Sequence, residues 1–124
     1  MPTWTDDELT RIGKAEELNL ASLRADDSLR NPVTMWVVRD GSDLYVRAYK
    51  GPDGPWYRGT RTRKEGRIHS GGVETDVTFA DETDPEVNDR IDAAYQTKYA
   101  RWPDYVGPML TPEARATTIR LIPR

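Results

Sequence analysis

The chain has 124 residues, of which 36% are hydrophobic and 31% charged, and this length predicts one domain spanning residues 1–124. It has no cysteine, one histidine and a net charge of −3, which excludes disulfides, thiol catalysis and a multi-histidine zinc site, and argues against nucleic-acid binding. It lacks an apolar run long enough to span a membrane and an apolar N-terminal leader, so we expect a cytoplasmic protein without a membrane partner.

The N-terminal segment predicts a helix over residues 6–17. Thr5 and Glu8 have the spacing of a capping box, and Trp4 and Leu9 have the spacing of a hydrophobic staple. Residues 18–24 weakly favour a strand, and residues 26–32 read as a loop that ends in a turn at Asn31-Pro32.

A β-hairpin is predicted next. Residues 33–39 are β-branched and aromatic, as strands prefer, and the Asp-Gly pair within residues 40–43 is typical of a tight hairpin turn. The returning strand, expected over 43–50, places Leu44, Val46 and Ala48 on a core face. Its other face carries two tyrosines and an arginine, an unusual surface to leave bare: Tyr45, Arg47 and Tyr49.

A loop over 51–55 leads into a short basic helix expected over 56–64, with Gly66 as its C-terminal glycine. A second hairpin is expected from strands 67–70 and 73–80 around Gly71-Gly72. Asp84 and Pro85 then open the longest helix, expected to run to about residue 100. Residues 105–109 read as loop, 111–113 as at most one helical turn, and 117–122 as a final strand.

This order of elements predicts an α+β fold. Short hairpins joined by helices favour an antiparallel sheet or a small barrel with helices packed at its ends.

A basic segment is the strongest candidate for a binding site. Residues 47–67 carry a net charge of +5, whereas residues 68–92 carry −7. Arginine forks suit phosphate, a helix N-terminus attracts anions, and aromatic rings offer flat surfaces, so a phosphate-bearing aromatic cofactor would fit here. The alternative is equally compatible with the sequence: the tryptophans anchor the core and the arginines pair with the acidic segment.

Catalytic signatures are absent from the sequence. It contains no phosphate-binding glycine loop, no dinucleotide fingerprint and no nucleophile elbow. His69 falls in an expected strand and is interpreted as a strand or loop residue, and the acidic residues of 74–92 match no calcium loop, so no metal site is expected. No residue is assigned as a catalytic acid or base.

The same stretch resembles the deazaflavin-dependent nitroreductase family. The resemblance is carried by residues 44–50, Gly51, the Pro55-Trp56-Tyr57 triplet and Gly71-Gly72, and it continues through residues 91–95, Lys98-Tyr99, Pro103-Asp104-Tyr105 and a closing strand at 119–123. More closely, the chain resembles a bacterial family of unknown function grouped with the flavin-binding split barrels. The likeness covers about residues 33–123, and no single part of it is decisive.

The resemblance implies a split β-barrel of about six antiparallel strands that forms a homodimer and binds FMN or an F420-type deazaflavin near the protomer interface. By match to the family, Lys50 meets the phosphate region of the cofactor and Trp56 is the tryptophan of the family's Trp-Tyr pair. The sequence departs from the family at Gly59, where the family has asparagine, and at residues 30–34, which lack its upstream basic motif.

Together, the basic segment and the family resemblance predict a set of cofactor contacts. We assign Arg47, Lys50, Arg58 and Arg61 to the phosphate, next to the strand-end turn at Gly51, and Trp36, Tyr49, Trp56 and Tyr57 to the ring or the substrate. The leading hypothesis is a flavin- or deazaflavin-dependent oxidoreductase acting on a small molecule. The alternatives are a non-catalytic module that binds another anionic aromatic ligand, and a dimerisation domain without a ligand.

Overall fold

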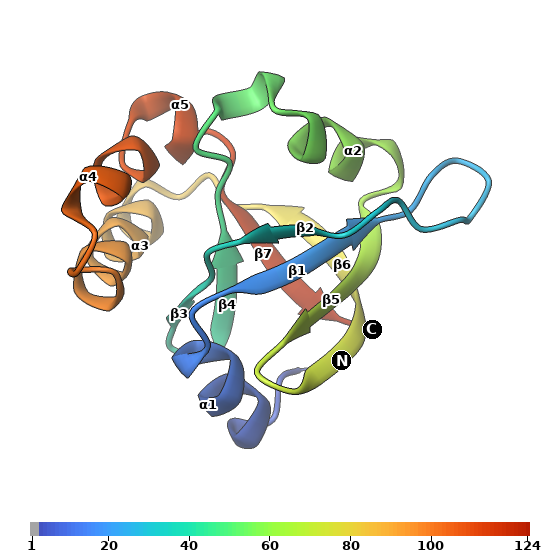
Figure 1. The fold of residues 1–124 in the computed structure, drawn as a ribbon, viewed down its shortest axis with the longest axis horizontal. Helices are drawn as coiled ribbons and strands as arrows, with labels where there is room; N and C mark the ends of the chain where they lie inside the picture. The colour runs from blue at the N-terminus through green and yellow to red at the C-terminus, as the bar shows by residue number, and fades with distance from the viewer. Residues whose placement is uncertain (1–2) are drawn as a thin grey trace.

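A computed structural model describes residues 3–124 of the chain (Figure 1). Seven strands occur in the described part: β1 (Leu18–Ser22), β2 (Val33–Met35), β3 (Val38–Asp40), β4 (Asp43–Val46), β5 (Glu65–Ser70), β6 (Val73–Asp81) and β7 (Ile119–Pro123). The helices are α1 (Asp6–Lys14), α2 (Pro55–Arg63), α3 (Pro85–Lys98), α4 (Pro103–Val106) and α5 (Pro112–Arg115), with 3-10 turns η1 (Gly51–Asp53) and η2 (Gly107–Met109).

The strands form one antiparallel sheet in the order β2-β1-β5-β6-β7-β4-β3. Its two edge strands, β2 and β3, are separated in the chain by Trp36 and Val37 alone. The sheet must therefore curl until its edges meet, which gives a half-open barrel with a seam at Trp36 (Figure 1). The expected α+β split barrel is confirmed, with seven strands in place of about six.

Two hydrophobic clusters hold the curled sheet. The first fills the barrel and is covered by α1, whose Leu9 and Ile12 join barrel residues such as Leu44 and Ile68. The second lies where α3 packs against β3, and it includes three buried tyrosines: Tyr45, Tyr95 and Tyr99. The helix thus covers Tyr45 on this face of β4, whereas Tyr49, beyond the end of the strand, remains exposed.

The expected capping box at the N-terminus is confirmed. The Thr5 hydroxyl accepts from Glu8 N at 3.1 Å and the Glu8 carboxylate accepts from Thr5 N at 2.9 Å, which completes the capping box. The helix ends at Lys14, three residues earlier than expected. Trp4 is anchored to the final strand, because its indole Nε1 donates to Leu121 O at 2.9 Å.

Two strand predictions were too long. The expected strand at 33–39 is divided into β2 and β3, because the chain crosses from one sheet edge to the other at Trp36 and Val37. The expected strand at 43–50 ends at Val46. Beyond it the chain leaves the sheet, and Ala48 N donates to the Thr117 hydroxyl at 2.8 Å.

The expected end of the basic helix at Gly66 was wrong. Helix α2 ends with Lys64 in the left-handed conformation (φ 57°), and Gly66 lies in β5 opposite Ser22. The expected loop at 105–109 was also wrong, since it forms the end of α4 and the turn η2. The remaining elements, α3, the β5–β6 hairpin, the single turn α5 and β7, lie where the sequence placed them to within a few residues.

Candidate functional site

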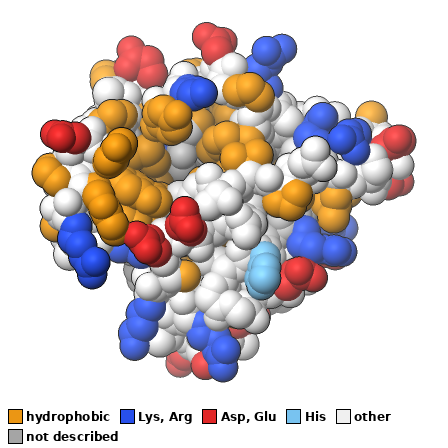
Figure 2. Space-filling model, in the orientation of Figure 1, with side chains coloured by type: hydrophobic (Ala, Val, Ile, Leu, Met, Phe, Trp, Pro, Cys, Tyr) orange, Lys and Arg blue, Asp and Glu red, His pale blue; other side chains and the backbone are white. Residues whose placement is uncertain are grey.

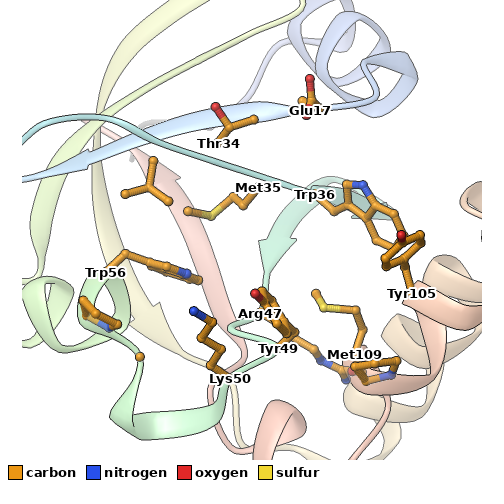
Figure 3. A pocket seen from close by; sticks show the side chains of 14 residues that line it. Glu17, Thr34, Met35, Trp36, Arg47, Tyr49, Lys50, Trp56, Tyr105 and Met109 are labelled. Atoms are coloured by element: carbon orange, nitrogen blue, oxygen red, sulfur yellow. The ribbon is translucent and has the colours of Figure 1, made fainter.

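A pocket of about 680 Å³ opens beside the barrel seam, between β2, α2 and α4 (Figure 3). Its walls are mainly apolar and aromatic, as in most small-molecule sites. It is lined by Glu17, Val33, Thr34, Met35, Trp36, Arg47, Tyr49, Lys50, Gly54, Pro55, Trp56, Tyr105, Pro108 and Met109. Hydrophobic side chains gather on this face over α4 and extend toward α2 (Figure 2).

Five of the nine residues predicted from the sequence line this pocket. They are Trp36, Arg47, Tyr49, Lys50 and Trp56. The other four, Gly51, Tyr57, Arg58 and Arg61, lie outside the lining. Because the pocket forms where distant segments meet, adjacency in the basic segment did not decide which of its residues face the cavity.

Lys50 and Trp56 are brought together by the turn between β4 and α2. Pro55 and Trp56 open α2, while Lys50 precedes η1 (Figure 3). Gly51 allows this turn because its φ is +79°, a conformation that favours glycine. A Cβ at this position would lie 3.3 Å from the Glu113 side chain. In Figure 3 the Lys50 ammonium and the Trp56 indole both point into the cavity.

Lys50 is the uncommitted cation of the pocket. Within residues 3–124 no carboxylate lies within ion-pair distance of Lys50, and its ammonium lies 5.8 Å from the centre of the Tyr49 ring. The adjacent N-terminus of α2 has Gly54 as its N-cap and no side-chain cap. An anion at Lys50 would therefore meet a charge without a competing partner.

Arg47 lines the pocket, but its charge is used inside the protein. The residue is 1% exposed, and all five N–H groups of its guanidinium donate to protein oxygens. Nε donates to the Thr118 hydroxyl at 2.9 Å; Nη1 donates to Asp92 Oδ1 at 2.5 Å and Met109 O at 3.0 Å; Nη2 donates to Asn88 O at 3.1 Å and Asn88 Oδ1 at 2.9 Å. The expected phosphate contact by Arg47 has no donor left to make it.

The other arginines of the basic segment differ in whether they form an ion pair. Arg61 makes a two-pronged ion pair with Asp81, and this hydrogen bond raises the pKa of the guanidinium. Arg67 pairs with Asp76. Arg58 is exposed on α2 and has no ion pair among the described residues. The alternative interpretation from sequence, in which the arginines pair with acidic residues, thus holds for Arg47, Arg61 and Arg67.

Tyr57 belongs to the interior. Its ring packs in the barrel core, and its hydroxyl accepts from Arg61 Nη1 at 3.3 Å. Burial raises the pKa of this phenol. Gly59, where the resembled family has asparagine, packs under Arg30: a Cβ at this position would lie 2.8 Å from Ser22 Oγ and 3.0 Å from Arg30 Nε. A larger side chain there would require the Ser22 and Arg30 side chains to move.

Trp36 lies at the other end of the pocket and is held by a stack of rings. Its indole lies parallel to Tyr99, with 3.8 Å between ring centroids and 4° between planes. The Tyr99 hydroxyl accepts from Val37 N at 3.2 Å and lies 2.7 Å from Glu16 O, which accepts from it. Burial raises the pKa of this phenol, which keeps it a neutral donor.

Sequence reasoning missed the wall contributed by residues 105–109. Tyr105, Pro108 and Met109 line the pocket, and Met35 faces them from β2 (Figure 3). The only local signal was an aromatic residue in a segment interpreted as a loop. In the described part of the chain, no group of three or more His, Asp or Glu side chains is placed to hold a metal ion. His69 does not line the pocket.

The curled seven-stranded sheet and the pocket at its seam define a protein of the split-barrel class, in which the fold is shared by several ligand-binding proteins. Among solved structures, the heme storage protein HutZ from Vibrio cholerae matches with a TM-score of 0.67 at 15% identity, covering 100% of this chain and 92% of its own. An F420-H2 dependent reductase matches with a TM-score of 0.63 at 14% identity, covering 86% and 93%. An FAD-binding protein from Mesorhizobium loti matches with a TM-score of 0.59 at 13% identity, covering 98% and 91%.

The chain belongs to the bacterial family of uncharacterised conserved proteins DUF2255, whose model matches residues 8–121. The expected kinship with a bacterial family of unknown function among the split barrels is thereby confirmed. No curated protein matches the sequence. Across residues 3–124, none of the helices has the length and apolar character needed to cross a membrane.

Proposed function

We propose that this protein binds a flavin- or deazaflavin-type cofactor, FMN or an F420-type deazaflavin, in the seam pocket and acts as an oxidoreductase on a small molecule. The observation that carries the proposal is Lys50, which has no ion-pair partner within residues 3–124 and points into an apolar pocket beside Trp56. Split-barrel structures described as FAD-binding and as F420-dependent reductases support it at the level of fold.

The residues present fit such a cofactor. Trp56 offers a flat surface for a ring system, and Met35 across the cavity adds an apolar wall. Lys50 and the free N–H groups at the start of α2 suit a phosphate. When bound, a cofactor of this kind supplies the hydride chemistry, while the protein binds and orients the reactants.

The chain's own contribution is positioning and exclusion of water. The pocket lining contains one carboxylate, Glu17, which lies just before β1 and is exposed. Arg47 is committed to internal hydrogen bonds. No side chain in the lining is therefore assigned to proton transfer, and apolar walls that limit water strengthen the remaining charge at Lys50.

Replacing Lys50 by alanine tests the proposal. Titration of the wild-type protein with FMN or a deazaflavin, followed by quenching of protein fluorescence, should give saturable binding with a Kd below about 100 μM. Charge-assisted contacts contribute about 1.5–3 kcal/mol, so Lys50→Ala should weaken FMN binding at least about tenfold. The same substitution should leave the Kd for riboflavin unchanged, because riboflavin has no phosphate.

The matched control is Arg58→Ala, which removes an exposed cation on α2 that does not line the pocket. It should leave both affinities unchanged. An equal loss in the two variants would place the phosphate on the outer face of α2. If no flavin or deazaflavin binds, the hypothesis that the protein is an oxidoreductase is wrong. Binding without reduction of any acceptor would favour the non-catalytic binding module.

A homodimer is part of the proposal. Val33 and Tyr49, two of the exposed large hydrophobic residues found in residues 3–124, border the pocket, and a second copy of the chain would shield them from water. Light scattering at micromolar concentration should give twice the chain mass of 14.1 kDa. A mass of one chain would show that the pocket is completed by one protomer alone.

A further inference from the structure

The two ends of the seam pocket differ in chemistry. Figure 3 shows Trp56 and Lys50 at one end and Trp36 and Tyr105 at the opposite end. The free charge lies at the first end, next to the uncapped start of α2. The second end is aromatic, and Met109 lies between the two.

Trp36 is a fixed platform at this second end. One face of its indole is covered by the parallel stack on Tyr99, and Trp102 lies against it at 6.2 Å between centroids. The residue is nevertheless only half-buried, and it lines the cavity. A flat ring could therefore pack on Trp36 without a rearrangement, which lowers the entropic cost of binding.

Tyr105 is the second aromatic group of this end and is 68% exposed. Within residues 3–124, no aromatic stack or side-chain hydrogen bond fixes the Tyr105 ring in place. A large aromatic side chain that is left in water beside a cavity gains burial when a ligand enters. Trp36 supplies the rigid surface of this end, and Tyr105 supplies an adaptable one.

The charges at this end select against ionic ligands. The Arg47 guanidinium, which donates to Met109 O, has every N–H donor occupied, and Glu17, the one carboxylate of the pocket lining, is exposed. A carboxylate or phosphate placed here would lose its water without gaining a cationic partner, which is costly. A neutral ring loses only unfavourable contact with water.

From these observations we infer that the Trp36–Tyr105 end is a separate binding site for a flat, uncharged aromatic molecule. The inference rests on the proposed function: that molecule is the substrate, and the Lys50–Trp56 end holds the cofactor. The two ligands occupy the pocket together and lie next to each other within it. The site therefore selects substrates that are planar and uncharged.

The test uses two isosteric probes, neutral 2-naphthamide and anionic 2-naphthoate, in equilibrium dialysis against the full chain. We expect naphthamide to bind about tenfold more tightly than naphthoate. Saturating oxidised FMN should leave the naphthamide Kd within about twofold, because the two sites do not overlap. Equal binding of the two probes, or competitive displacement of naphthamide by FMN, would overturn the inference.

Two variants separate the ends of the pocket. Tyr105→Ser should raise the naphthamide Kd about fivefold and leave the FMN Kd unchanged. Lys50→Ala should weaken FMN binding and leave naphthamide binding unchanged. Because Tyr105 is exposed, its replacement should not unfold the protein, and circular dichroism checks this. If FMN fails to bind, the proposed function fails, whereas the naphthamide measurements on the protein alone still decide this inference.

Discussion

Arg47→Met should lower the free energy of unfolding by about 3–5 kcal/mol, the cost typical of removing one partner from a buried charge network. The substitution keeps an unbranched side chain but removes five hydrogen-bond donors at a position that is 1% exposed. It leaves the carbonyl oxygens of Asn88 and Met109 without these partners. Urea unfolding followed by tryptophan fluorescence measures the loss.

Arg58→Met is the matched control for this prediction. Arg58 is exposed on α2, and methionine has a similar helix propensity, so stability should change by no more than about 0.5 kcal/mol. A folded Arg47→Met protein of unchanged stability that no longer binds FMN would contradict this assignment. It would return Arg47 to the role expected from the sequence, that of a phosphate ligand.

Gly66→Ala should destabilise the fold by about 3 kcal/mol, at the upper end of the cost of overpacking. A Cβ at Gly66 would lie 2.2 Å from Ala21 O and 2.9 Å from Phe79 Cζ. The nearest atom belongs to the backbone of β1, the strand that pairs with β5, so the clash cannot be relieved by turning a side chain. Thermal unfolding should show a clearly lower midpoint.

The control for this second prediction is Gly107→Ala. Gly107 has helical dihedrals (φ −48°, ψ −50°), and no heavy atom lies within 4 Å of an added Cβ. Alanine there should be neutral or stabilising by about 0.4–1 kcal/mol, because it restricts the unfolded chain. Equal midpoints for the two variants would mean that β1 and β5 can separate at Gly66 without cost.

The sequence by itself determined the elements whose signals lie within a few residues. The capping box at Thr5 and Glu8 defined α1, the Asp-Gly turn defined the β3–β4 hairpin, and Asp84 with Pro85 defined the start of α3. These signals act through backbone hydrogen bonds and dihedral preferences, so they need no partner from elsewhere in the chain. The family resemblance added the split barrel, which local signals could not specify.

The tertiary structure decided which basic residues remain available to a ligand. Arg47 is neutralised by Asp92, 45 residues away, whereas Lys50, three residues after Arg47, has no carboxylate partner in the described chain. The tertiary structure also places Gly66 in β5, where the sequence predicted a helix cap, and it places Tyr105 and Met109 at the seam. Charge pairing and packing join residues that are distant in the chain, and a sequence read locally contains the groups but not their partners.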